Sequence, residues 1–323
     1  MLYRLPAICI ISVLFLVPGT VNANDEKETG RLEAGRSTCN HDAEENEEWL
    51  DITHRYINES MCIPAEWVDS FFSTERLDEE VRPGSYVRWI NDFVQTEGGQ
   101  YNYVTKIRAN LRLPKATKKL KLIIEGEQEE SVDDVISVNE DDVKTNVGLL
   151  YELLQSQRSN LNLKLNLSPK IALRYRYTYP FSEYFLSRFT QDYFKSDDDG
   201  GSESRLDLEN RFNDRFLLRW SNIYQDTELI DGIQWTYSLV LYQRLSDVNA
   251  LSYESSVSVL TEPEWFHSNE RLAIRYRQSF YRKWLFYELV PEITWPKVLP
   301  TDQRQQVALF TFRLEIKFNS ISD

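Results

Sequence analysis

The sequence has little of what most membrane proteins and many enzymes depend on. After residue 23 it has no long apolar run, whereas a transmembrane helix needs about 20 consecutive apolar residues. It has only 3 histidines and 3 cysteines, which leaves few candidates for nucleophilic catalysis or a transition-metal centre. Its net charge of -14 provides no basic excess for nucleic acid. We therefore expect no helical membrane span, no cofactor and no nucleic-acid partner.

The first 23 residues have the pattern of a secretory signal peptide. A short basic start precedes an apolar run from Leu5 to Gly19, and Val21-Asn22-Ala23 supplies the small residues that signal peptidase requires. The sequence therefore predicts an exported chain in which segment 1–23 is removed after Ala23.

An acidic segment follows the predicted cleavage site. Residues 24–85 contain 17 Asp or Glu and 6 Lys or Arg, and their aromatic residues recur near helical spacing. We expect a short helical arm in the periplasm, which either caps the rest of the protein or binds a periplasmic partner protein. Cys39 and Cys62 lie in this arm, and an oxidising compartment would allow a disulfide between them.

From residue 86 the pattern changes to strict alternation. In the segment YNYVTKIRANLRLP, for example, one face carries tyrosines and aliphatic residues while the other carries Asn, Lys and Arg, which is typical of β-strands with one polar face. The predicted strands are 86–95, 101–113, 118–125, 147–155, 161–167, 171–179, 184–194, 204–212, 216–225, 233–245, 250–260, 270–280, 285–295 and 306–318. This reading predicts 14 strands, with 12 as the alternative.

The connections between these strands indicate which kind of all-β fold they form. Tight turns at 114–118, 213–215, 246–249 and 281–284 alternate with longer predicted loops at 126–146, 195–203, 226–232, 261–269 and 296–305. Short turns on one side and long loops on the other are typical of outer-membrane barrels. We predict an antiparallel up-and-down transmembrane β-barrel over 86–318, followed by a tail, 319–323.

Aromatic residues near the strand ends favour the membrane form over a soluble barrel, because interfacial girdles of Tyr and Trp flank the lipid-facing band. A closed barrel is also the one sheet that a bilayer interior tolerates, since lipid cannot satisfy an open edge. The predicted girdle residues are Tyr101, Tyr193, Tyr224, Trp235, Trp284, Trp295 and Phe318.

The chain resembles bacterial outer-membrane β-barrel proteins in its closing segment FTFRLEIKF. The stretches WVDSFFSTERLDEE, RANLRLPKATKKLKL and FYRKWLFYELVPEITWP are similar to a Gram-negative outer-membrane family that brings no assigned activity. The resemblance implies a bacterial outer-membrane location, contact with lipid and lipopolysaccharide, and assembly by the outer-membrane insertase. It implies that Phe318 is the aromatic insertion signal, although five residues follow it.

If the apolar face meets lipid, the charged residues of the other face line the barrel interior. In one interpretation these residues form ion pairs that stabilise the barrel wall. In the other they line a narrow passive or gated channel. Neighbouring strands rich in arginine would favour anionic solutes. The principal candidates are Arg174, Arg176, Arg188, Arg205, Arg211, Arg219, Arg275, Arg277, Glu288, Glu292, Arg313 and Glu315; Arg108, Arg112, Asp192, Asp207, Glu209 and Glu254 share their faces. The alternative function is a non-conducting structural or assembly barrel.

An enzyme is the least favoured reading. His267 and Ser268 are reminiscent of the His-x-Ser arrangement of lipid-modifying outer-membrane barrels, but here they are adjacent, and adjacent residues of a strand point to opposite faces. The acidic loops lack the ligand spacing of an EF-hand. We therefore predict no catalytic residue and no resident metal.

Overall fold

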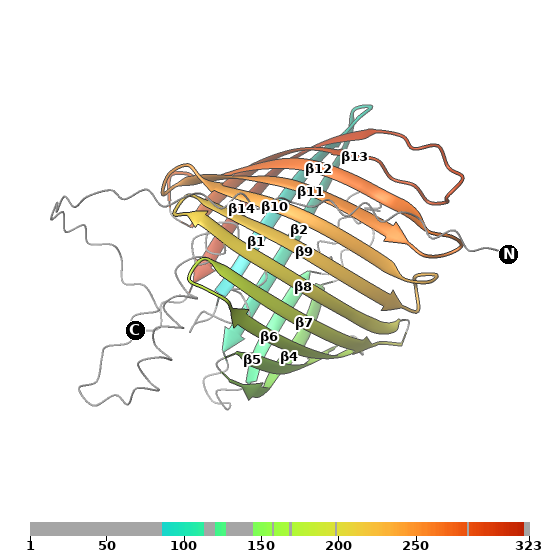
Figure 1. Ribbon diagram of the computed structural model, residues 1–323. Helices are drawn as coiled ribbons and strands as arrows, with labels where there is room; N and C mark the ends of the chain where they lie inside the picture. Colours follow the sequence, from blue (N-terminus) through green and yellow to red (C-terminus); the bar gives the residue numbers. More distant parts are fainter. Residues whose placement is uncertain are drawn as a thin grey trace, which may run out of the picture. The chain divides into compact units, whose positions relative to one another are not determined.

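The computed structural model describes residues 86–112, 120–126, 145–156, 158–167, 170–197, 199–282 and 284–319. These residues form a closed barrel of fourteen antiparallel strands in which each strand pairs with its neighbours in the sequence and β1 pairs with β14 (Figure 1). Within this part of the chain, no helix is long and apolar enough to cross a membrane. The prediction of fourteen strands is confirmed, and the alternative of twelve is wrong.

The bounds of the strands follow the alternating segments of the sequence closely. They are β1 Tyr86–Thr96, β2 Gln100–Arg112, β3 Leu120–Gly126, β4 Thr145–Gln155, β5 Ser159–Asn166, β6 Ile171–Pro180, β7 Phe185–Lys195, β8 Gly200–Asn213, β9 Phe216–Thr227, β10 Gln234–Arg244, β11 Asn249–Leu260, β12 Phe266–Ser279, β13 Leu285–Thr294 and β14 Val307–Asn319. The predicted helical arm, including Cys39 and Cys62, lies outside the described residues, as do residues 320–323 of the predicted tail.

Two strands begin four residues earlier than their sequence indicates. β8 begins at Gly200, because its first residues are glycines that suit a close backbone approach: a Cβ on Gly201 would collide with the backbone oxygen of Asp226 on β9. β12 begins at Phe266 because the register with β11 shifts at a β-bulge, so the strand continues through a segment that looks irregular in sequence. The predicted long loops at 195–203 and 261–269 are therefore shorter, spanning 196–199 and 261–265.

The two ends of the barrel differ in their connections. The end that holds the start of β1 and the end of β14, here called the turn end, includes the two-residue connection 214–215. The opposite end, the loop end, includes the two longest connections, 127–144 and 295–306. It also includes one tight turn, 97–99, where Gly98 and Gly99 adopt φ values of 101° and 80°, which glycine reaches without strain. The asymmetry agrees with the predicted topology.

The two faces of the wall differ in polarity. Outward-facing aliphatic and aromatic side chains are well exposed, such as Leu239 at 44%, Leu272 at 52% and Phe310 at 42%. The inward-facing residues that alternate with them are mostly polar and buried. Aromatic side chains gather near both ends, including Tyr101 and Tyr193 at the loop end and Trp284 at the turn end. Only a surrounding apolar phase stabilises such an outer face, so the fold is that of a transmembrane β-barrel.

The closing strand β14 lies between β13 and β1. Its side chains alternate as the sequence predicts: Phe312 is outward and contacts Phe93 of β1, with ring centroids 6.0 Å apart, while Arg313 is inward and contacts Asp92. Eleven residue pairs join β1 and β14, from Tyr86 with Asn319 to Thr96 with Leu309. The barrel is thus sealed along the full length of β1, and Asn319 belongs to the strand.

Candidate functional site on the inner face of the barrel

A group of fully buried ion pairs lies on the inner face near the turn end. Arg277 of β12 contacts Glu288 of β13, and its Nη1 also donates to Glu315 Oε2 of β14 at 2.7 Å. Glu315 accepts a second bond from Arg88 Nε of β1 at 2.9 Å. Arg277 and Glu315 are 0% exposed and Glu288 is 1% exposed. Buried charges of this kind are stable only when each has a partner, so the group depends on its complete composition.

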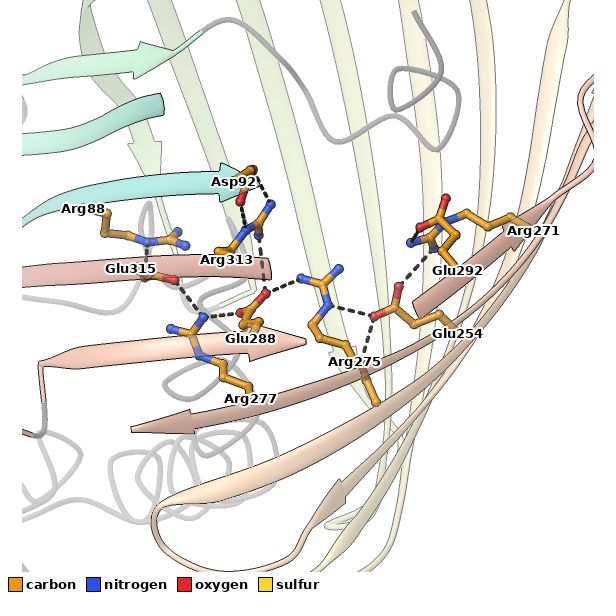
Figure 2. A network of polar contacts seen from close by, with 11 residues as sticks. Arg88, Asp92, Glu254, Arg271, Arg275, Arg277, Glu288, Glu292, Arg313 and Glu315 are labelled. Atoms are coloured by element: carbon orange, nitrogen blue, oxygen red, sulfur yellow. Dashed lines mark hydrogen bonds and ion pairs between the residues drawn. The ribbon is translucent and has the colours of Figure 1, made fainter. Parts of the chain in front are cut away.

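The same ion-pair system continues toward the loop end through β11. Arg275 lies 3.5 Å from Glu288 by its Nη1 and donates through Nε to Glu254 Oε1 at 3.2 Å. Arg271 then joins Glu254 Oε2 at 3.0 Å with Glu292 Oε2 at 2.7 Å. Basic and acidic groups therefore alternate along the neighbouring strands β11, β12, β13, β14 and β1, and Figure 2 shows the contacts between them.

Arg313 forms a branch of the network at the barrel seam. Its Nε and Nη2 donate to the two carboxylate oxygens of Asp92 at 2.6 and 3.1 Å, a bidentate pair between β14 and β1 (Figure 2). Its Nη1 lies 3.7 Å from Glu288 Oε2. The closing seam is thus tied into the same charge system as β11, β12 and β13.

We call this inner surface of β11, β12, β13, β14 and β1 the paired wall. Among its described side chains six are basic and five acidic: Arg88, Arg271, Arg275, Arg277, Arg313 and Lys317 against Asp92, Glu254, Glu288, Glu292 and Glu315. Nearly every charge is matched. Lys317 and Arg277 also lie over the Phe286 ring, 4.7 and 4.3 Å from its centroid, which adds cation–π stabilisation.

The inner surface of β2 to β7, which we call the basic wall, has a different balance. Among its described side chains seven are basic and two acidic: Lys106, Arg108, Lys121, Lys164, Arg174, Arg176 and Arg188 against Glu152 and Asp192. The two carboxylates form ion pairs, Arg174 Nε with Asp192 Oδ1 at 2.7 Å and Lys121 Nζ with Glu152 Oε1 at 2.6 Å. The described basic side chains of these strands therefore outnumber the described carboxylates.

Hydroxyl groups of neighbouring strands contact two of these arginines. Arg176 Nε donates to Thr190 Oγ1 at 3.4 Å, and Arg188 Nε donates to Thr178 Oγ1 at 3.3 Å. A hydroxyl accepts a hydrogen bond but leaves the positive charge in place. Counted over its described side chains, the basic wall carries a net positive charge, and Arg188 at its edge also lies opposite Asp207 of β8.

The strands between the two walls are balanced. On β8 and β9 Arg219 donates to Glu209 at 3.0 Å and to the Tyr242 hydroxyl of β10 at 3.2 Å. Arg205 lies 3.5 Å from Glu203, and Asp207 accepts a bond from Ser221. Arg211 lies near the turn end, where its guanidinium is 3.7 Å from Asp214 and lies over the Tyr184 ring.

The residues predicted to line the interior fall into three groups in the structure. Arg275, Arg277, Glu288, Glu292, Arg313 and Glu315 belong to the paired wall; Arg174, Arg176 and Arg188 belong to the basic wall; and Arg205, Arg211 and Arg219 lie between them. The sequence prediction did not include Arg88, Asp92, Lys121, Glu152, Glu203, Arg271 and Lys317, whereas Lys106 and Lys164 lie on the polar faces that the alternation predicts. The alternation of each strand carries this signal, since Arg88 and Asp92 alternate with the exposed Trp89 and Phe93.

The side chains considered for catalysis do not form a nucleophile and base. His267 is exposed and its Nδ1 lies 2.9 Å from Glu270 Oε1, whereas Ser268 is buried. The two adjacent residues thus differ in environment, as expected for opposite faces of a strand. Across the described ranges, no three His, Cys, Asp or Glu side chains converge as a metal site requires.

Phe318, the predicted insertion signal, is exposed at 53% on the outward face at the turn end, where it pairs with Val87 of β1. The described β14 continues one residue beyond it, to Asn319. An aromatic side chain therefore marks the outer edge of the closing strand.

The closed barrel, its apolar outer face and its charged inner face define the transmembrane β-barrel class. No protein-family model matches the chain, and no curated protein sequence is detectably similar to it. Solved structures of outer-membrane proteins are similar in form. They include an anion-selective porin from Comamonas acidovorans (TM-score 0.45, 9% identity, 72% of this chain and 98% of that chain), the outer membrane channel DcaP of Acinetobacter baumannii (0.45, 8%, 73% and 96%) and a bacterial polysaccharide outer membrane secretin (0.44, 10%, 74% and 100%).

Proposed function

We propose that this protein is a narrow passive or gated channel of the bacterial outer membrane that favours small anionic solutes. The observation that carries the proposal is the basic wall: among the described side chains on the inner face of β2 to β7, seven are basic and two are acidic. A barrel of this strand number is wider than one whose own side chains fill it, which leaves room for a water-filled pathway.

The outer-membrane location is part of the proposal. Closed barrels are the form in which β-strands cross lipid, because no strand edge is left unpaired. A predicted signal peptide, short turns at one end and longer loops at the other support insertion of an exported chain from the periplasmic side. In this arrangement the turn end faces the periplasm, the outward aromatics lie at the two lipid interfaces, and the loop end meets lipopolysaccharide.

Anion preference follows from the charge balance of the interior. A wall of basic groups raises the local concentration of anions and lowers that of cations, and a low-dielectric surround strengthens the effect. Guanidinium groups also bind carboxylate and phosphate oxygens through paired hydrogen bonds. The paired wall contributes little field, because its charges nearly cancel.

Planar lipid bilayers test the proposal directly. The full chain, refolded in detergent and added to a bilayer under a KCl gradient, should give single-channel events whose reversal potential has the sign of chloride permeation. An absence of events from protein shown to be folded would eliminate the channel, and a cation-selective reversal potential would eliminate the anion preference.

The alternative is a non-conducting barrel whose arm binds an envelope partner. A chain without residues 24–85 distinguishes the two functions. Conductance that persists, or increases, in the shortened chain supports a channel. If both forms are silent while the arm alone retains a periplasmic protein, the partner-binding function replaces it.

Assembly of the barrel supplies a separate proposal for Phe318. Its exposed ring at the turn end is available to the outer-membrane insertase, which reads an aromatic residue in the last strand of its substrates. Phe318→Ala should therefore slow insertion in cells. Folding of the same variant into synthetic vesicles, where no insertase is present, should be nearly unchanged.

A further inference from the structure

Three neighbouring strands carry polar side chains on the face that meets lipid. Gln191 of β7 lies between Phe189 and Tyr193, which are 38% and 57% exposed on the outer face. Gln191 pairs with Ser204 of β8, whose hydroxyl donates to its Oε1 at 2.5 Å. The pair therefore lies within the apolar band and not on the inner face.

Asn222 of β9 extends this polar stripe. It pairs with Leu206 on one side and with Tyr237 of β10 on the other, both of which are outward residues. It is diagonal to Ser204, whose direct partner is Tyr224, and diagonal neighbours across a sheet are about 7–8 Å apart. Gln191, Ser204 and Asn222 each lie at least four residues from either end of their strands. The stripe is thus well inside the membrane-spanning band.

Gln191 is already bonded to Ser204 and through its Nε2 to the Asp192 carbonyl at 3.2 Å, but lipid at this depth cannot hydrogen-bond the Asn222 amide. The Asn222 side chain makes no hydrogen bond to the described residues, and its amide is partly exposed on the outer face. The primary amide presents two donors and one acceptor oxygen, and hydrocarbon offers none of either. An amide left open in the middle of the bilayer is costly, whereas the same amide at a protein contact is bonded.

A second polar cluster on the outer face is hydrogen-bonded within the barrel. Between β1 and β2, Asn91 Oδ1 accepts bonds from the Tyr103 hydroxyl at 2.7 Å and the Thr105 hydroxyl at 3.1 Å, and Trp89 Nε1 donates to Thr105 at 2.9 Å. Asn91 is 6% exposed. This cluster is bonded within one barrel, as are Gln191 and Ser204, so Asn222 is the member of the stripe whose amide is left for a partner.

We propose that the outer face of β7, β8 and β9 is a contact surface for a second copy of this chain in the membrane. Two copies inserted in the same direction are related by a rotation axis along the membrane normal. Each residue therefore lies at the same membrane depth in both copies. A primary amide both donates and accepts hydrogen bonds, which makes the Asn222 amide complementary to the same amide of a second copy. A single self-complementary patch closes as a two-fold dimer. The flanking Phe189, Trp220 and Tyr237 supply apolar area around the bonded centre.

Site-directed cross-linking in native membranes tests the surface. Ser204→Cys and Asn222→Cys, treated with a short thiol cross-linker, should give a covalent dimer of this chain. Ser255→Cys is the matched control, because Ser255 is also outward and central in its strand but lies on β11, between Leu239 and Leu272. The wild-type chain, whose own 3 cysteines are shared by every variant, is the blank.

Two results would overturn the proposal. One is the absence of dimer at positions 204 and 222, or an equal amount at position 255. The other is cross-linking of positions 204 and 222 to a different protein or to a lipid without any dimer of this chain.

Light scattering in mild detergent provides a second readout. The wild type should have the mass of a dimer, and the double variant Gln191→Leu with Asn222→Leu should have the mass of a monomer. Because these changes remove amides from a lipid-facing surface, the monomeric barrel should remain folded and at least as resistant to urea. A double variant that remains a dimer contradicts the proposal.

Discussion

The paired wall and the basic wall contain similar numbers of basic side chains but differ in what stands beside them. On the paired wall, carboxylates such as Glu288 and Glu315 lie between arginines of neighbouring strands. On the basic wall, Arg188 and Arg176 donate to the hydroxyls of Thr178 and Thr190, and Arg188 also lies opposite Asp207 of β8. The arginines of the two walls therefore differ in the charge of their surroundings. On the paired wall the arginines are matched by carboxylates of neighbouring strands, whereas on the basic wall the described basic side chains outnumber the described carboxylates.

Loss of one arginine from the centre of the paired wall should have the largest effect on stability. Arg277→Ala leaves Glu288 and Glu315 without one of their buried partners, and breaking a buried ion pair from one side costs about 3–5 kcal/mol. Urea unfolding in lipid vesicles, followed by tryptophan fluorescence, measures this loss. Arg174→Ala on the basic wall is the matched control.

The control should lose about 1 kcal/mol or less, because the Arg174 and Asp192 side chains are 27% and 16% exposed and water compensates the broken pair. The double variant Arg277→Met with Glu288→Gln removes one charge of each sign and should recover most of the loss. Equal destabilisation by Arg277→Ala and Arg174→Ala would show that the two walls do not differ as described.

The sequence predicts the strands and which residues face inward, but it does not predict which inward charges pair with one another. The period of two predicts the fourteen strands, and it separates inward from outward residues because both faces of a membrane barrel alternate strictly. The starts of β8 and β12 could not be predicted, because both depend on a neighbouring strand. The backbone of β9 lies close to Gly201 of β8, and β12 has a bulge in its pairing with β11. Which arginine meets which carboxylate could not be predicted either. Arg277 and Glu315 lie 38 residues apart and are brought together by register across β13.

Charge reversal on the basic wall should have the largest effect on ion selectivity. Arg176→Glu with Arg188→Glu changes the charge of this wall by four units, and one unit charge about 8 Å away in water changes the free energy of an ion by about 0.5 kcal/mol. The preference for chloride over potassium should fall on the order of tenfold after screening. Reversal potentials under a KCl gradient measure it.

The matched control for this reversal comes from the paired wall. Arg277→Met with Glu288→Gln leaves the net charge of that wall unchanged, so the reversal potential should remain at the wild-type value. A shift as large as that of the basic-wall variant would mean that the paired wall also controls selectivity, and the distinction between the walls would fail.

Ionic strength should weaken the basic wall and leave the paired wall intact. The Debye length falls from about 10 Å at 0.1 M salt to about 3 Å at 1 M, so the field of the basic wall's net charge should reach less of the pathway. The anion preference should decline steadily with KCl concentration, as reversal potentials at a constant concentration ratio would reveal. Resistance to urea should change little, because the buried pairs are shielded from salt. Selectivity that is independent of salt would point to a steric origin.

The smallest change is the introduction of one carboxylate into the basic wall. Thr190 is buried, accepts a bond from Arg176 and pairs with Arg205 on its other side. Thr190→Asp would add a carboxylate between these two arginines, and it lowers the net positive charge of the basic wall by one unit. The anion preference should fall about twofold, less than for the double reversal. Thr190→Asn, which has a similar shape and no charge, should leave the reversal potential unchanged. If both variants shift it equally, side-chain volume and not charge sets the selectivity of this wall.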